Sequence, residues 1–161
     1  MADANVAGLS TLGVLFGFAV ETVAGEKPTA FYKLDRINSI GGISLDTEKI
    51  DASCLEDEVS RYVRGRQDSG GTWNVTFNLT DEVKAQIDDM MDEYENRGEG
   101  KRMWFEVYSP DMKDGFFVVA QPPKHIPMPE FSQNALLTVE IVFTLEEYKG
   151  MLTAIKPVAK A

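Results

Sequence analysis

The chain has 161 residues, 43% of them hydrophobic, and a formal net charge of −10 that arises from 26 acidic and 16 basic side chains. This length suits one domain that buries a core without disulfides. The acidic excess argues against a protein that binds nucleic acid or anionic lipid through clustered cations. Cys54 and His125 are the only residues of their types, so neither a cystine framework nor a four-ligand zinc site can form within the chain. We therefore expect no catalytic residue, no cofactor and no metal site.

The N-terminal third is predicted to contain an arm and two strands. Residues 1–11 are small and weakly polar, which is typical of an arm. Residues 12–21 are β-branched, aromatic and dotted with glycine, which favours a strand over a helix. Their apolar run is too short to cross a membrane and lacks the cations of an export signal, so we expect a cytosolic product. Residues 34–45 are predicted to form a second strand, interrupted at Gly41 and Gly42.

Residues 46–71 form a long polar segment in which an acidic half precedes a basic half. Only residues 59–63 have the composition of a short strand, and loops of this length in compact domains are usually functional or disordered. Twenty extended residues would reach about 65 Å at roughly 3.3 Å per residue. A solvated, flexible loop is the alternative. The residues through which we expect the loop to act are Glu48, Asp51, Leu55, Glu56, Asp57, Glu58, Arg61, Tyr62, Arg64 and Arg66.

The clearest periodicity lies in two adjoining segments. Apolar and polar residues alternate from Trp73 to Thr80, which predicts a half-buried strand. Residues 81–96 then repeat apolar side chains at helical spacing, with Thr80 or Asp81 as the N-cap and two glycines beyond the end. The opposite side of this helix is strongly acidic, and we expect it to be solvated.

The remaining strands are predicted at residues 102–109, 116–120 and 134–148, and residues 149–161 are predicted to be a C-terminal arm. Prolines stiffen the loop around His125, which we expect at the surface. Together these elements predict a mainly β (α+β) fold over residues 1–161. It is an antiparallel β-sandwich or barrel-like domain with one flanking amphipathic helix, one long charged loop and two arms.

A series of short segments in a fixed order carries further information: residues 12–21, 36–43, 50–53, 55–57, 61–73, 101–110, 118–123, 136–140 and 145–150. They include the runs Arg36-Ile37-Asn38-Ser39-Ile40 and Val118-Val119-Ala120-Gln121-Pro122-Pro123. These segments resemble the major tail tube protein of long-tailed bacteriophages and prophages of Gram-positive hosts. The resemblance spans nearly the whole chain, and its specificity lies in the number and order of the segments.

The resemblance implies a structural virion protein rather than an enzyme. Its subunits would form hexameric rings that stack into a hollow tube, with the long loop and the arms joining the rings and strands of neighbours closing an inner barrel. The implied partners are further copies of the chain, the tape-measure protein, the tail terminator and the distal tail or baseplate proteins. DNA would be passing cargo that is not bound specifically. The implied location is the virion tail, assembled in the host cytoplasm without membrane contact.

A ring whose sheet faces inward would line its channel with the polar faces of its strands. The resulting lumen-facing candidates are Asn74, Thr76, Asn78, Thr138, Glu140 and Thr144. The alternative hypothesis is a monomeric β-sandwich module that binds carbohydrate or a protein. Such modules present exposed aromatic residues in a groove, a role for which Trp104 and Tyr108 are the candidates.

Overall fold

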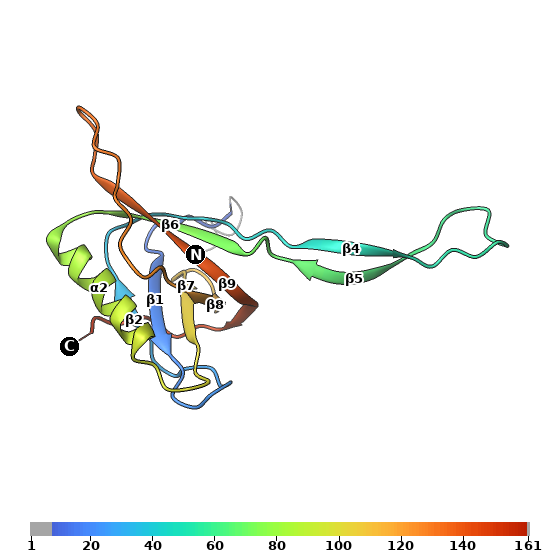
Figure 1. The fold of residues 1–161 in the computed structure, drawn as a ribbon, viewed down its shortest axis with the longest axis horizontal. Helices are drawn as coiled ribbons and strands as arrows, with labels where there is room; N and C mark the ends of the chain where they lie inside the picture. The colour runs from blue at the N-terminus through green and yellow to red at the C-terminus, as the bar shows by residue number, and fades with distance from the viewer. Residues whose placement is uncertain (1–7, 161) are drawn as a thin grey trace.

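A computed structural model describes residues 8–160 of the chain (Figure 1). Residues 1–7 of the predicted N-terminal arm lie outside the described residues, as does Ala161. The described elements are β1 (Leu15–Val20), β2 (Tyr32–Leu34), β3 (Ile37–Ile40), β4 (Asp46–Asp51), β5 (Tyr62–Asp68), β6 (Thr72–Asn78), α2 (Asp81–Glu95), β7 (Met103–Tyr108), β8 (Asp114–Gln121) and β9 (Thr138–Thr153).

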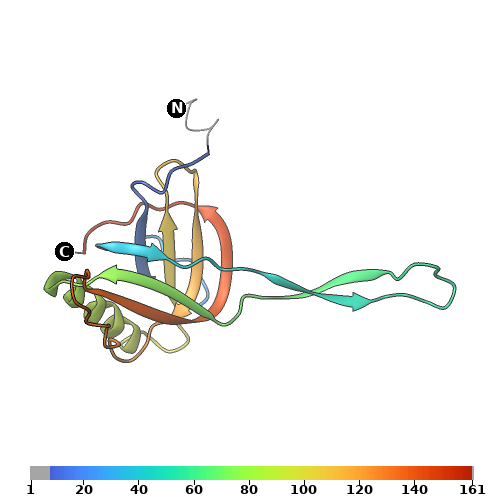
Figure 2. The same cartoon turned by 90° about the horizontal axis from the view of Figure 1, so that it is seen from above.

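Seven of the strands form one sheet in the order β2-β1-β7-β8-β9-β6-β3, and β4 and β5 form a separate hairpin. All the strand pairs of the sheet are antiparallel. The sheet bends at β9, because the first half of this strand pairs with β6 and its second half pairs with β8. Figure 2 shows how the bend carries β6 and β3 across the strands β1, β7 and β8. The predicted mainly β, antiparallel fold with one flanking helix is therefore confirmed.

Aromatic side chains fill the space inside the bend. Phe16, Phe105 and Phe143 are fully buried, with ring centroids 4.7 to 6.5 Å apart. Trp73 packs beside them, and its indole N–H donates to the carbonyl of Gly41 over 2.6 Å. The inward positions of β6 are the alternate apolar residues that the sequence predicts for the core face of a half-buried strand: Trp73, Val75 and Phe77.

The helix α2 begins and packs as its sequence predicts. The Thr80 hydroxyl accepts the backbone N–H of Val83 over 3.2 Å, which is the expected N-cap bond. The helix ends at Glu95 with Asn96 as its C-cap, one residue before the predicted end. Its buried stripe closes one side of the core with Val83, Ile87, Met90 and Met91.

The predicted strand at residues 34–45 is confirmed only for β3, which ends just before Gly41; Leu34 belongs to a separate short strand, β2, at the opposite edge of the sheet order. β2 pairs with β1, and β3 pairs with β6. Arg36 turns the chain between them with a φ of 58°, a left-handed conformation that few non-glycine residues adopt. Two hydrogen bonds between Asp35 and Gln86 of α2, of 2.9 and 2.8 Å, hold this turn against the helix. No sequence pattern marks an arginine for such a turn.

The C-terminal arm predicted at residues 149–161 begins later, because β9 continues to Thr153. Beyond β9 the chain folds back over the outer face of the sheet. Val158 bridges to Tyr32, and the Lys160 ammonium pairs with Asp89 over 2.9 Å and with Glu93. The strap formed by residues 154–160 helps to cover a second apolar cluster made of Ala19, Phe31, Trp104, Phe117 and Val119.

Candidate interaction surfaces

The β4–β5 hairpin leaves the bent sheet and extends away from it in both views (Figures 1 and 2). The expected loop is therefore corrected to a paired stem, in which Lys49 lies opposite Arg64 and Ile50 lies opposite Val63. The sequence pattern missed β4 and placed the other strand too early, at residues 59–63, because both faces of the hairpin are exposed and no apolar and polar alternation marks its strands. Since the chain doubles back near the tip, the hairpin reaches about 40 Å at roughly 3.3 Å per residue, rather than about 65 Å.

The two faces of the hairpin stem differ in chemistry, because side chains alternate along a strand. One face carries the apolar pair Ile50 and Val63, which are 53% and 50% exposed. The other carries Lys49 directly opposite Arg64 and, next along the stem, Asp51 opposite Tyr62, while a register shift between Thr47 and Lys49 breaks the alternation before Arg66. Like charges in opposite positions of a hairpin repel. Among residues 8–160, neither Lys49 nor Arg64 forms an ion pair.

The tip of the hairpin is acidic and carries exposed apolar residues. Leu55 is fully exposed and Val59 is 77% exposed. Arg61 pairs with Asp57 over 3.1 Å, while Glu56 and Glu58 lie on either side of Asp57 in the sequence. The stem is mixed in charge, with Asp46, Glu48, Asp51 and Asp68 beside Lys49, Arg64 and Arg66. The structure places the expected loop residues as follows: Glu48 and Asp51 in β4; Tyr62, Arg64 and Arg66 in β5; Leu55, Glu56, Asp57, Glu58 and Arg61 at the tip.

The expected lumen-facing residues lie on one face of the β6–β9 ladder, opposite the core. Register pairs Thr76 with Glu140 and Asn78 with Thr138. The amide of Asn38 in the edge strand β3 donates to the Asn78 side chain over 2.8 Å, which extends this polar face by one strand. One large apolar residue is exposed on this polar face in the described part of β6 and of β9 before the bend. It is Val142, which lies opposite Asn74. The six candidates brought together are Asn74, Thr76, Asn78, Thr138, Glu140 and Thr144.

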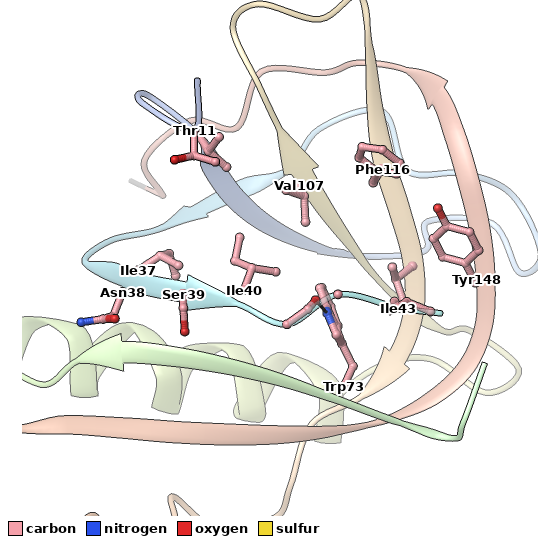
Figure 3. Close-up of a pocket in the computed structure, with 14 residues that line it drawn as sticks. Thr11, Ile37, Asn38, Ser39, Ile40, Ile43, Trp73, Val107, Phe116 and Tyr148 are labelled. Atoms are coloured by element: carbon pink, nitrogen blue, oxygen red, sulfur yellow. Dashed lines mark hydrogen bonds between the residues drawn. The ribbon is translucent and has the colours of Figure 1, made fainter. Parts of the chain in front are cut away.

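A cavity of about 610 Å³ opens between β3 and the strands behind it (Figure 3). Ile37, Ile40 and Ile43 line its β3 side, and Phe116 and Tyr148 line the facing strands. No charged side chain is among the described residues that line it. The cavity is thus a largely apolar opening beside a sheet edge.

Glu21 is a buried carboxylate that sequence analysis did not single out. It accepts the indole N–H of Trp104 over 2.8 Å, the backbone N–H of Arg102 over 2.8 Å and that of Gly25 over 3.1 Å. Burial opposes its charge, but these hydrogen bonds and the Arg102 guanidinium outweigh it and hold the pKa of Glu21 below its ordinary value. Glu21 therefore joins β1, β7 and the turn after β1 as a structural anchor.

Glu106 is a second buried carboxylate, on the outer face of β7. One oxygen accepts the backbone N–H of Ile155 over 2.9 Å, and Oε1 has no hydrogen-bond partner among residues 8–160. Burial raises the pKa of Glu106 to about 7, although the Ile155 N–H and the Lys27 ammonium act in the opposite direction. Gly115 leaves the space, since a Cβ there would lie 2.9 Å from Oε2. Glu106 lies on the face of β7 opposite the main core, and the C-terminal strap buries it there.

The aromatic platform that would favour a carbohydrate-binding module is absent from its expected place. Trp104 is 3% exposed and donates to Glu21, and Tyr108 is half-buried at the end of β7. Within residues 8–160, no three acidic, His or Cys side chains gather as metal ligands would. In the same part of the chain, no helix has the length and apolarity needed to span a membrane.

Comparison with known proteins finds no matching family model and no matching curated protein. Solved structures do match. A chain from the tail of an empty gene transfer agent particle, refined helically with C6 symmetry, aligns over 92% of this chain and 100% of its own, with 14% identity and a TM-score of 0.55. The chain shares the fold of a protein in that tail. A chain from the virion of a native gene transfer agent particle aligns over 91% of this chain and 100% of its own, with 13% identity and a TM-score of 0.57.

Proposed function

We propose that the chain is a structural subunit of a phage-like tail, which assembles as hexameric rings stacked into a hollow tube. The observation that carries this proposal is the β4–β5 hairpin, which extends from the body with exposed apolar residues on its stem and tip (Figure 1). A two-stranded hairpin by itself is marginally stable in water. Ordered strands in such a position gain stability when a neighbouring subunit covers them, and the reach of about 40 Å suits contact between rings.

The shared fold supports the same proposal, since the matched chain comes from a tail with C6 symmetry. In our proposal this chain also forms rings of six, and the polar face of β6 and β9 lines the channel. The candidates for that lining remain Asn74, Thr76, Asn78, Thr138, Glu140 and Thr144. The tape-measure protein would occupy the channel during assembly, DNA would pass through it later without specific binding, and the tail terminator and the distal tail or baseplate proteins would close the two ends.

In this proposal the chain has no enzymatic activity and needs no cofactor, and its place is the virion tail after assembly in the host cytoplasm. The comparisons lend no support to a Gram-positive host, which stays an expectation from the sequence resemblance. The alternative of a monomeric binding module loses its aromatic candidates, because Trp104 is buried and bonded to Glu21.

Electron microscopy of the purified chain at rising concentration tests the proposal. We expect monomers at low concentration and six-fold rings or tubes at high concentration, with size-exclusion chromatography showing the same shift. A matched sample that lacks residues 46–68 should stay folded and stop at single rings or monomers. A wild-type chain that remains monomeric at every concentration and ionic strength would contradict the proposal.

A further inference from the structure

The segment that joins β8 to β9 projects from the body as a second protrusion, in a direction different from that of the β4–β5 hairpin (Figure 1). We call its residues 127–136 the apolar loop. Three large apolar side chains are exposed on it: Met128 by 86%, Phe131 by 69% and Leu136 by 67%. Its single charged residue, Glu130, accepts a hydrogen bond from the Ser132 hydroxyl over 2.9 Å. Exposed apolar side chains gathered in this way mark a site of interaction.

The apolar loop is held to the body at both ends. Before its start, Ile126 packs against the main core cluster. After its end, the carbonyl of Leu137 accepts the backbone N–H of Leu79 over 3.0 Å. Within the loop, Pro127 and Pro129 each fix their own φ. A segment that is ordered in advance loses less conformational entropy when it binds, so the apolar loop is suited to docking as a pre-formed unit.

The cavity beside β3 has the size and chemistry to accept such a loop. Its volume of about 610 Å³ falls within the range of pockets that enclose organic ligands, so aromatic and aliphatic side chains can enter it. Ile40, Phe116 and Tyr148 line it, and no charged side chain does so among the described residues (Figure 3). Within residues 8–160, β3 pairs with β6 alone, which leaves the other edge of β3 free beside the opening.

The two features belong to different sides of one chain. The apolar loop leads into β9, and the sheet order places β9 on the other side of β6 from β3. The loop also projects away from the bent sheet, whereas the cavity lies between β3 and the strands behind it (Figures 1 and 3). Because both of its ends are anchored, the loop does not cross to the cavity of its own chain. The loop of a second copy is free to approach that cavity from outside.

We propose that the apolar loop of one copy inserts Phe131 into the β3 cavity of the adjacent copy in the same ring. Aromatic side chains in a desolvated pocket commonly carry much of the binding energy of an interface. Met128 and Leu136 pack at the rim of the cavity. Each copy donates its loop to one neighbour and accepts the loop of the other, and a contact of this heterologous kind closes into a ring where the rotation allows it. This inference rests on the proposed function, because it names the surfaces that join the subunits of a ring.

A second hollow, of about 400 Å³, is the competing acceptor, and its charges argue against it. It lies beside α2, and its lining includes Asp88, Asp92, Glu95 and Lys124. An apolar loop would cover these charged groups without offering them a partner, and burying a charge without a partner is costly. The β3 cavity imposes no such cost, because no described residue of its lining is charged.

Substitutions on both sides of the contact test the docking. Phe131→Ser removes the inserted ring, and Gly42→Leu fills part of the cavity, because Gly42 lines it and an added Cβ there meets nothing within 4 Å. Each should raise the protein concentration at which rings form about tenfold or more, measured by sedimentation and electron microscopy, and should leave the urea midpoint of the monomer unchanged. Gln133→Ala, exposed on the same loop, is the matched control and should stay within about twofold of wild type. Ring formation at the wild-type concentration by both Phe131→Ser and Gly42→Leu would overturn the proposal.

Cross-linking identifies the partner and counts the copies. In a Cys54→Ser background, which removes the only native cysteine, Ser132→Cys places a thiol beside Phe131 and Ser39→Cys places another at the cavity. A short thiol-to-thiol cross-linker should give covalent oligomers that stop at six copies, because the contact closes within a ring of that size. Ser132→Cys combined with Glu26→Cys, at an exposed position after β1, is the matched control and should give no oligomers. Oligomers that continue beyond six copies would place the contact between rings, and a cross-link within one chain would place the loop in its own cavity; either result overturns the proposal.

Residues 1–7 are the competing occupant of the cavity, because Thr11, a few residues further along the chain, lines it. Val6→Cys in place of Ser132→Cys tests this alternative in the same Ser39→Cys background. If the Val6→Cys protein cross-links and the Ser132→Cys protein does not, the N-terminal segment fills the cavity and the proposal is overturned.

Failure of this inference and failure of the proposed function give different results. If the wild type forms rings but Ser132→Cys and Ser39→Cys give no covalent oligomer, the apolar loop does not join the subunits of a ring, and the proposed function stands without it. If the wild type forms neither rings nor tubes, the proposed function itself fails and this inference fails with it.

Discussion

The unpaired oxygen of Glu106 makes the stability of the monomer depend on pH. The pKa of Glu106 is about 7 in the folded chain, against an ordinary value of 4.5. Between these values the folded state keeps a proton that the unfolded state has released, so the free energy of unfolding falls as the pH rises through this window. The whole loss is at most about 3.4 kcal/mol, at 1.36 kcal/mol per pKa unit.

We predict that Glu106→Gln flattens this dependence, because the amide cannot ionise. Urea unfolding of the monomer at pH 5 and pH 8 measures it: the wild type should be less stable at pH 8, and the variant should lose less between the two values. Glu140→Gln changes an exposed carboxylate and should keep the wild-type slope. Equal slopes for Glu106→Gln and the wild type would show that this carboxylate is already ionised at pH 5.

Glu21 should be the most sensitive charged residue of the body. Replacement by Ala leaves the Trp104 indole N–H and the backbone N–H groups of Arg102 and Gly25 without their acceptor, so Glu21→Ala should cost about 3–5 kcal/mol. Chemical denaturation of the monomer measures the loss, and near-ultraviolet circular dichroism reports on Trp104. Glu26→Ala, on the exposed part of the same turn, should change stability by less than about 0.5 kcal/mol.

The sequence predicted which apolar side chains of β6 are buried, but it did not predict that the carboxylates of Glu21 and Glu106 are buried. Trp73, Val75 and Phe77 alternate with polar neighbours and face the core as expected. Trp104 and Glu106 alternate in the same way along β7, yet they are buried on its other face. The difference arises from the strap of residues 154–160, which covers that face from far along the chain. The alternation of residues within β7 cannot reveal that a segment about 50 residues later in the sequence covers that face.

At the scale of elements, the hairpin should matter for assembly and hardly for folding. Leu55 and Val59 are exposed, so changing both to Ser removes no buried contact of the monomer. We predict an unfolding free energy within about 0.5 kcal/mol of wild type but a clear loss of tubes in electron micrographs. Ile141→Ala is the contrasting variant, because it empties a fully buried site and should cost about 2–5 kcal/mol. If the double Ser variant forms normal tubes, the hairpin tip does not contribute to the contact between subunits.

The helix α2 could be predicted from its sequence, whereas the strands of the β4–β5 hairpin could not. The helix α2 could be predicted to within a residue, because one face is buried and its N-cap is local. The strands β4 and β5 pair with each other only, and their exposed faces give no periodic apolar signature. Their charges were visible in the sequence, but only the register of the hairpin shows that Lys49 lies directly opposite Arg64.

In an assembled tube, the face of the β6–β9 ladder that turns toward the channel sets the charge of the channel wall. The core lies on the other side of these strands, and the outer face is polar with Glu140 as a charged member. In a hexamer each position recurs six times per ring, so a single substitution on this face alters the charge of a complete belt. A channel that conducts DNA should carry no net positive belt, since phosphate attraction would hold the passing strand.

We predict that Thr76→Lys combined with Glu140→Lys gives tubes that form normally but retain DNA. The two positions are opposite one another across the β6–β9 pair, so the introduced ammonium groups form a dense ring of charge. Labelled DNA should co-sediment with these tubes at low salt, resist nuclease because it lies inside, and be released as the salt concentration rises. Glu82→Lys adds positive charge on α2 instead, so any DNA it retains should lie outside and be digested. Nuclease-sensitive DNA on the Thr76→Lys, Glu140→Lys tubes would place this face on the outer surface and overturn the assignment of the lumen.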